Sequence, residues 1–131
     1  MRNDPRENLL NIHRRHVKAW EQKNLDRFRD LYADQITIFH TGPPPRFSDF
    51  NTFENTLQQY FSKMQEVAFL TSNIQIEVFG EVAWITSLYL MAYQRNGQLR
   101  RENGRWTEIY QRIDQDWKLI HLHASPDPSQ R

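Results

Sequence analysis

The chain has 131 residues, a length that suits one domain, with 17 Lys and Arg against 16 Asp and Glu and a net charge of +1. This balance argues against nucleic-acid binding, which normally needs a basic excess on one face. The absence of cysteine excludes disulfides, thiolate metal sites and a Cys nucleophile. We find no apolar signal segment and no run of about 18 apolar residues, so we expect a cytoplasmic protein without membrane contact.

Three helices are predicted in the first half of the chain. Asp4 can cap the first, and Pro5 suits its first helical position, with helical spacing continuing to about residue 22. A short second helix is predicted over about 25–32. A third covers about 50–64, where large apolar residues recur at helical spacing.

Strands dominate the second half. A β-branched segment at 36–40 is followed by a proline-rich loop at 41–45, and later strands are predicted at about 72–79, 82–94, 99–112 and 117–125. Helices followed by strands with short links indicate an α+β fold, with three N-terminal helices packed on a strongly curved mixed or antiparallel sheet. We expect one domain over 1–131, ending in a short polar tail at 126–131.

Two turn signals set the register of this sheet. Gly80-Glu81 and Asn96-Gly97 are typical of two-residue hairpins. We further expect a three-residue loop before the last strand. One face then becomes largely apolar, with a single carboxylate, and comprises Ile74, Ile76, Val78, Ala83, Ile85, Ser87, Tyr89, Trp106, Glu108, Tyr110, Ile120, Leu122 and Ala124.

The opposite face is also half apolar, which is unusual for a solvated surface. Its largest apolar residues predict a homodimer through this face, and they are Trp84, Ile109, Trp117 and Leu119. His121 and His123 are two residues apart and point the same way, as metal ligands can. A third ligand is not evident, so we expect no metal and favour a structural or interface role for the two histidines.

The run from Gly104 to Ser125, in which Trp117 is followed by the ending His121-Leu122-His123-Ala124-Ser125, resembles the closing hairpin of SnoaL-like proteins in the nuclear transport factor 2-like superfamily. Two earlier segments also resemble those of the family and occur in the same order, and they are Leu31-Tyr32-Ala33-Asp34 and Gly80-Glu81-Val82-Ala83-Trp84-Ile85. The resemblance is greatest to the branch that includes the association domain of calcium/calmodulin-dependent protein kinase II. It implies a cone-shaped α+β half-barrel, with a pocket between the helices and the concave sheet face.

The family's functional side chains are replaced in this chain. The resemblance places His40 where the steroid isomerases carry a general-base Asp, His16 at their oxyanion-binding Tyr, and Glu108 close to their protonated Asp. The kinase association domains have pocket arginines at positions that match Tyr89, Glu108 and Ala124. Neither steroid isomerisation nor that basic pocket can therefore be carried over.

Three residues are candidates for chemistry. His40 can exchange a proton near neutral pH, although a strand-end histidine can simply bond to a backbone carbonyl. Glu108 lies among apolar neighbours, which predicts that the pKa of its carboxyl group is raised. It can then act as an acid, or pair with His16 or His40. The alternative is a structural pairing with an arginine. His16 can equally be a half-solvated helix residue. The candidate ligand-binding residues are Tyr89, Trp106, Tyr110, Ile85 and Leu122.

Three functions stay open on these grounds. We favour a dimeric domain that binds a small molecule with an apolar body, without a cofactor. The second is a cofactor-free isomerase, cyclase or dehydratase in which His40 is the general base and Glu108 the acid or hydrogen-bond donor. The third is a non-catalytic association module.

Overall fold

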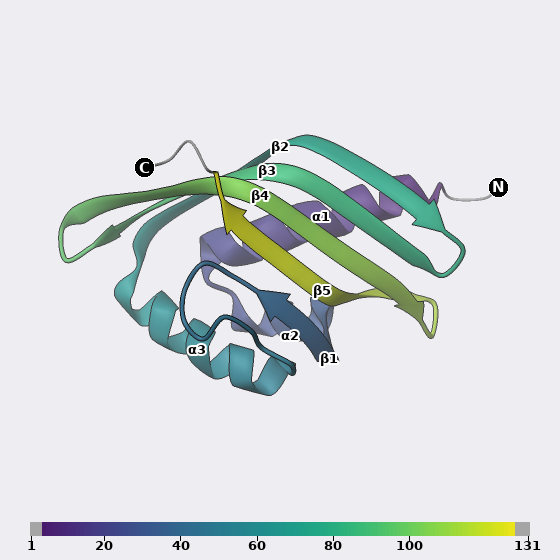
Figure 1. The fold of residues 1–131 in the computed structure, drawn as a ribbon, viewed down its shortest axis with the longest axis horizontal. Coiled ribbons are helices and arrows are strands. Elements are labelled where there is room, and N and C mark those ends of the chain that lie inside the picture. Colours follow the sequence, from purple (N-terminus) through teal and green to yellow (C-terminus); the bar gives the residue numbers. More distant parts are fainter. Residues whose placement is uncertain (1–3, 128–131) are drawn as a thin grey trace.

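The computed structural model describes residues 4–127, and within this part of the chain three helices pack against one five-stranded sheet (Figure 1). The helices are α1 (Pro5–Gln22), α2 (Leu25–Leu31) and α3 (Phe50–Lys63). The strands are β1 (Tyr32–Phe39), β2 (Gln65–Phe79), β3 (Val82–Arg95), β4 (Gln98–Ile113) and β5 (Asp116–Pro126). The α+β class with three helices before the long strands is confirmed. Most of the expected polar tail, residues 128–131, lies outside the described residues.

The sheet is mixed and curled, with the strand order β1-β5-β4-β3-β2. β1 runs parallel to β5, and every other neighbouring pair is antiparallel. α1 lies along the inner face of the sheet, while α2 and α3 sit beneath β1 in Figure 1. This arrangement leaves the opposite, outer face of the sheet without a helix.

Side-chain caps begin all three helices. The Asp4 carboxylate accepts a hydrogen bond from the Arg6 N–H at 2.9 Å, and Asn24 and Asp49 do the same for α2 and α3. Each bond satisfies one of the backbone donors that a helix start leaves unpaired. The predicted start of α1 is confirmed.

The two expected hairpin turns are present. Asn96 and Gly97 have φ values of 53° and 75°, the left-handed pair that a tight two-residue hairpin requires. The register places Ile76 opposite Ile85, and Ile85 opposite Glu108, as the turns predict. Glu108 therefore lies on the inner face of the sheet.

The register of β5 differs from the prediction. Its turn has two residues, Asp114 and Gln115, both with positive φ, instead of three. The register then shifts between Ile109 and Tyr110, so Tyr110 lies opposite Leu119 and not Ile120. One extra residue in β5 therefore reverses the face of the sheet to which the side chains at the start of this strand point.

This shift corrects the predicted interface. Trp117 and Leu119 face the helices and are only 7% and 0% exposed. They cannot belong to an outer surface, whereas Trp84 and Ile109 keep their expected outward direction. A second shift, between Ser72 and Gln75, places Ile74 among the exposed apolar residues, contrary to the expectation that it faces inward.

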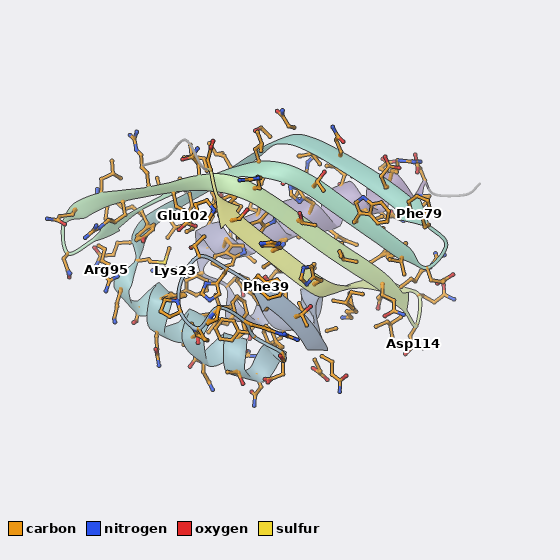
Figure 2. The ribbon with its side chains drawn as sticks, in the orientation of Figure 1. Lys23, Phe39, Phe79, Arg95, Glu102 and Asp114 are labelled. Atoms are coloured by element: carbon orange, nitrogen blue, oxygen red, sulfur yellow. The ribbon has the colours of Figure 1, made fainter. Side chains whose placement is uncertain are left out.

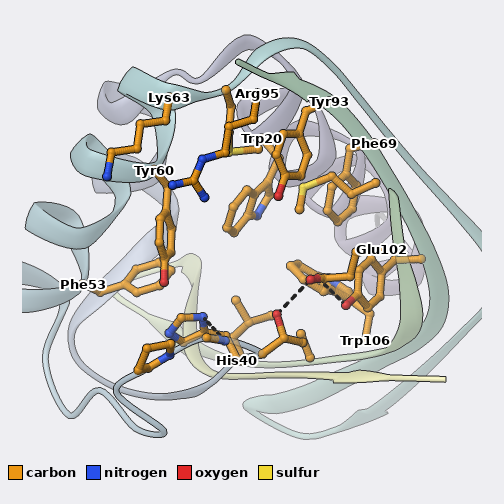
Figure 3. Close-up of a pocket in the computed structure, with 18 residues that line it drawn as sticks. Trp20, His40, Phe53, Tyr60, Lys63, Phe69, Tyr93, Arg95, Glu102 and Trp106 are labelled. Carbon is orange, nitrogen blue, oxygen red and sulfur yellow. Dashed lines mark hydrogen bonds between the residues drawn. The ribbon is translucent and has the colours of Figure 1, made fainter. Parts of the chain in front are cut away.

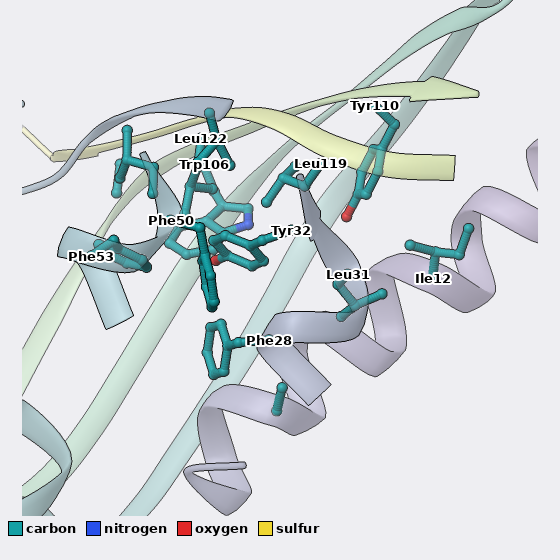
Figure 4. Packing of buried hydrophobic residues seen from close by; sticks show 14 of the residues in the cluster. Ile12, Phe28, Leu31, Tyr32, Phe50, Phe53, Trp106, Tyr110, Leu119 and Leu122 are labelled. Atoms are coloured by element: carbon teal, nitrogen blue, oxygen red, sulfur yellow. The ribbon is translucent and has the colours of Figure 1, made fainter. Parts of the chain in front are cut away.

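The core is rich in aromatic rings (Figure 4). Tyr32, at the start of β1, stacks on Phe53 of α3 with ring centroids 5.9 Å apart and contacts Phe28 of α2 at 5.3 Å. Burying a ring of this size contributes roughly 1.5–3 kcal/mol, so these contacts hold α2 and α3 against β1. No helix within residues 4–127 combines the length and apolar character needed to cross a membrane.

Candidate functional site

A cavity of about 330 Å³ lies between the helices and the inner face of the sheet (Figure 3). It is walled by the end of α1, by α3, by the loop that follows β1, and by the inner faces of β2, β3, β4 and β5. Most of the wall is apolar or aromatic, and these residues are Trp20, Pro43, Phe53, Tyr60, Met64, Phe69, Tyr89, Met91, Tyr93, Trp106, Leu122 and Ala124. A wall of this kind suits a ligand with an apolar body.

The structure separates the predicted site residues into two groups. His40, Tyr89, Trp106 and Leu122 line the cavity. The others do not line it and lie fully buried in the core; they are Glu108, His16, Tyr110 and Ile85. The expectation that His40 and Glu108 share one pocket is therefore wrong, and the catalytic roles assigned to them stay predictions.

His40 follows the last residue of β1, and its ring stacks on Phe47 with centroids 5.1 Å apart. The backbone N–H of Gly42 donates to Nδ1 of His40 at 3.3 Å. In the neutral ring the proton must then lie on Nε2. This Nε2 is buried and has no hydrogen-bond partner among the described residues. Burial lowers the pKa of His40, with Glu102 opposing, so the neutral form that donates from Nε2 is favoured.

Glu102 of β4 is held by two hydroxyl groups. Tyr89 donates to one carboxylate oxygen at 2.7 Å, and Thr41 donates to the other at 2.9 Å. Burial, together with the adjacent Glu102 carboxylate, raises the pKa of Tyr89, which keeps its hydroxyl group protonated as a donor. Both oxygens of the carboxylate thus have partners within the chain.

Trp106 supplies a second donor in the cavity wall. Its Nε1 is buried and lacks a hydrogen-bond partner in the part of the chain that the structure describes. The indole packs between aromatic neighbours, with ring centroids 5.1 Å from Phe69 and 5.3 Å from Tyr89. An indole N–H can only donate, so this position calls for an acceptor.

Gly42 makes room for Tyr60 of α3. A Cβ at position 42 would lie 2.8 Å from the Tyr60 hydroxyl oxygen and 3.4 Å from Cε1 of His40. Burial raises the pKa of Tyr60, so its hydroxyl group stays neutral. The loop after β1 can therefore approach α3 closely only because residue 42 has no side chain.

Beneath the cavity lies a buried cluster around Glu108. Its carboxylate accepts hydrogen bonds from Nδ1 of His13, from Nδ1 of His16 at 2.8 Å, and from the Tyr110 hydroxyl group at 2.5 Å. Nε2 of His13 is in turn bonded to the Thr71 hydroxyl group at 2.8 Å. Every polar atom of this carboxylate is thus engaged by donors from α1 and β4.

The cluster reverses the expected pKa shift of Glu108. Burial by itself raises the pKa of a carboxyl group, as the sequence predicts. The hydrogen bonds from His13 and His16 outweigh it and lower the pKa to about 2. Glu108 is therefore an ionised acceptor and not a neutral acid.

Several residues of the site were missed from sequence, and strand alternation could have found some of them. Glu102 is four residues before Trp106 on β4, and Arg95 is six residues after Tyr89 on β3, so each shares the inner face. Tyr60 lies in the predicted third helix, where helical spacing alone does not separate a cavity residue from a core residue. Nothing in the local pattern of α1 links His13 to a carboxylate 95 residues away.

The two histidines of β5 lie on the other side of the sheet. Nδ1 of His121 is bonded to the Thr37 hydroxyl group at 2.7 Å, and the rings of His121 and His123 are 6.4 Å apart. Within residues 4–127 no group of three or more His, Cys, Asp or Glu side chains is placed to hold a metal ion.

A family model described as a SnoaL-like domain matches residues 10–128 of this chain. The chain belongs to the SnoaL-like domain family. A comparison with curated proteins finds no match.

Solved structures share the fold of this SnoaL-like domain. A nuclear transport factor 2-like superfamily protein from Salmonella enterica superposes with a TM-score of 0.85 at 15% identity, over 95% of this chain and 92% of that one. A nuclear transport factor 2-like protein of unknown function from Pseudomonas putida gives 0.81 at 17%, over 95% and 90%. The CaMKII hub of S. rosetta gives 0.84 at 14%, over 97% and 100%. At these identities the likeness shows the fold alone.

Proposed function

We propose that this SnoaL-like domain binds a small organic molecule that has an apolar body and a hydrogen-bond acceptor. One observation carries the proposal: Nε2 of His40 and Nε1 of Trp106 are both buried in residues of the cavity wall and have no partner among the described residues. Leaving a buried donor unpaired costs about 1–3 kcal/mol. A carbonyl or hydroxyl oxygen on a bound molecule would recover that cost.

The rest of the cavity supports the same conclusion. Its volume of about 330 Å³ falls at the lower end of the range for small-molecule sites. Trp20, Phe53 and Phe69 offer aromatic faces to a flat apolar ligand, and both oxygens of Glu102 already accept hydrogen bonds from hydroxyl groups. Shape and polarity thus agree with a ligand that is mostly apolar.

A matched pair of probes tests the proposal. Acetylnaphthalene carries a carbonyl acceptor, and ethylnaphthalene has nearly the same shape without one. Titration followed by tryptophan fluorescence should show tighter binding of acetylnaphthalene, and His40→Phe or Trp106→Phe should reduce the difference. Trp84→Phe, on the outer face, is the control and should preserve it. Equal binding of the two probes, or binding of neither, would contradict the proposal.

The enzymatic alternative receives less support from this geometry. An acid–base pair of His40 and Glu108 needs both groups near one ligand, but Glu108 lies beneath the cavity and accepts three hydrogen bonds. The neutral form of His40, a residue of the cavity wall, carries its proton on Nε2, which suits donation to an acceptor oxygen more than removal of a proton.

We further propose that two copies associate through the outer sheet face. Trp84 and Leu88 of β3 are 37% and 46% exposed there, and Phe79 stacks on Trp84 at 4.9 Å. Phe39 and Phe79 are labelled on this surface in Figure 2. Exposed apolar residues in this number favour a protein partner, and a second copy presents a matching surface. The proposed interface keeps Trp84 and Ile109 from the sequence prediction.

A further inference from the structure

The cavity wall includes two cations that have no counterion among the described residues. Lys63, at the end of α3, and Arg95, at the end of β3, both line the cavity and are exposed at its rim. Neither forms a hydrogen bond or ion pair within residues 4–127. By contrast, Arg112 is paired with Glu81 at 3.1 Å, and Arg29 with Glu54 at 2.5 Å. The two rim cations are thus available to pair with an anionic group of a ligand.

Arg95 is the better placed of the two. Figure 3 shows its side chain extending over the cavity on the side of Tyr60, while the Lys63 ammonium group points away from the centre. The apolar and aromatic middle of the cavity separates this rim from His40. A ligand that fills the cavity would therefore meet a donor at His40 and a guanidinium group at its other end.

The single carboxylate of the wall, that of Glu102, offsets only one of these two cations, which leaves a net charge of +1. Both oxygens of Glu102 already accept hydrogen bonds, from Tyr89 at 2.7 Å and from Thr41 at 2.9 Å. The charge that is free to act on a bound molecule is consequently positive. Aromatic rings such as Tyr60 and Tyr93 could in principle attract a cation, but Arg95 and Lys63 would repel it.

We propose that the ligand is a cyclic or aromatic carboxylic acid whose carboxylate lies at the rim against Arg95. This inference rests on the proposed function, because it names the chemical class that the same cavity would take. A guanidinium group can bond both oxygens of a carboxylate, which fixes the orientation of the ligand as well as its charge. The acceptor group of the ligand then lies at the His40 end.

Three probes with one naphthalene body and different charges test the assignment: naphthoate, naphthamide and naphthylmethylammonium. At low ionic strength naphthoate should bind about fivefold more tightly than naphthamide, the gain that a partly exposed ion pair provides, and the ammonium probe should bind most weakly. The preference should shrink as salt screens the rim. Arg95→Gln should abolish it.

Arg101→Gln is the matched control. Arg101 lies on the same β3–β4 hairpin but outside the cavity wall, so its loss changes the net charge equally and should preserve the preference for naphthoate. Equal binding of the three probes, or tightest binding of the ammonium probe, would overturn the carboxylate assignment. If none of the three probes binds while acetylnaphthalene does, the carboxylate assignment is overturned but the proposed function is not. Failure of acetylnaphthalene as well would overturn the proposed function itself.

Discussion

Nε1 of Trp20 lies 3.3 Å from Nε2 of His16. Because an indole N–H only donates, Nε2 of His16 acts as the acceptor, and the proton of its neutral ring lies on Nδ1, which faces Glu108 at 2.8 Å. Trp20 also forms part of the cavity wall. A chain of hydrogen bonds thus joins the wall to the buried carboxylate, and Glu108 helps to position Trp20 without touching the cavity.

Replacing Glu108 should destabilise the whole fold. In Glu108→Gln the side-chain amide can no longer accept from His13, His16 and Tyr110 together, which leaves a buried donor unpaired. We expect a loss of about 2–4 kcal/mol in the free energy of unfolding, measured with urea at pH 7. Glu77→Gln removes a carboxylate that is exposed on β2 and should change stability by less than about 0.5 kcal/mol. Similar losses in both variants would disprove the role of the buried cluster.

The same carboxylate predicts how stability depends on pH. The pKa of Glu108 is lowered from its ordinary value of 4.5 to about 2 in the folded chain. The unfolded state therefore takes up a proton first as pH falls, and the contribution of this group is complete above about pH 5 and lost as pH falls toward 2. That contribution is about 3 kcal/mol. Urea midpoints between pH 6 and pH 3 should fall more steeply in the wild type than in Glu108→Gln; parallel curves would refute the shift.

Gly42 and Tyr60 should be coupled in ligand binding. Gly42→Ala places a Cβ 2.8 Å from the Tyr60 hydroxyl oxygen, so the tyrosine must move into the cavity. We expect probe binding to weaken by about tenfold, and Gly42→Ala combined with Tyr60→Phe to recover most of it because the clashing oxygen is gone. Tyr60→Phe alone is the control. If Gly42→Ala binds acetylnaphthalene as well as the wild type does, the close approach has no functional effect.

Gly104 should be the least replaceable glycine of the sheet. A Cβ at this position would lie 1.9 Å from the carbonyl oxygen of Ser125, a backbone atom of the paired strand β5. Since neither strand can move without breaking the ladder, Gly104→Ala should cost about 3 kcal/mol or more, or prevent folding. Arg105→Ala, at the next and exposed position, should cost less than about 1 kcal/mol. Thermal unfolding of the two variants is the measurement, and comparable midpoints would argue against the contact.

The proposed dimer depends on Trp84. Trp84→Glu places a charge on the outer apolar face and should convert dimers to monomers, as measured by size exclusion with light scattering. His123→Glu, which adds the same charge at an exposed position of β5 on the same face, shows how far the interface extends. A Trp84→Glu variant that stays dimeric would place the interface elsewhere. Trp117 is unsuitable for this test because it is buried within the chain.

The sequence by itself determined the order of the helices and strands and half of the sheet register, although β1 begins at Tyr32 and β2 at Gln65, several residues before their predicted starts. Caps at Asp4 and Asn24 are local signals, since each side chain bonds to a backbone group two or three residues away. The Asn96-Gly97 turn is also a local signal. Once this turn is placed, the alternation of side chains along β4 predicts that Glu108 lies on the inner face, and no other contact of the fold is needed.

The tertiary structure decided what local signals do not contain. The extra residue near Ile120 reverses the direction of Trp117 and Leu119, because one residue changes the face of every side chain on that side of the shift. Whether Glu108 is an acid or an acceptor depended on His13 and His16, which approach it only when α1 packs on the sheet. A buried carboxyl group takes its charge state from its neighbours, and those neighbours come from distant parts of the chain.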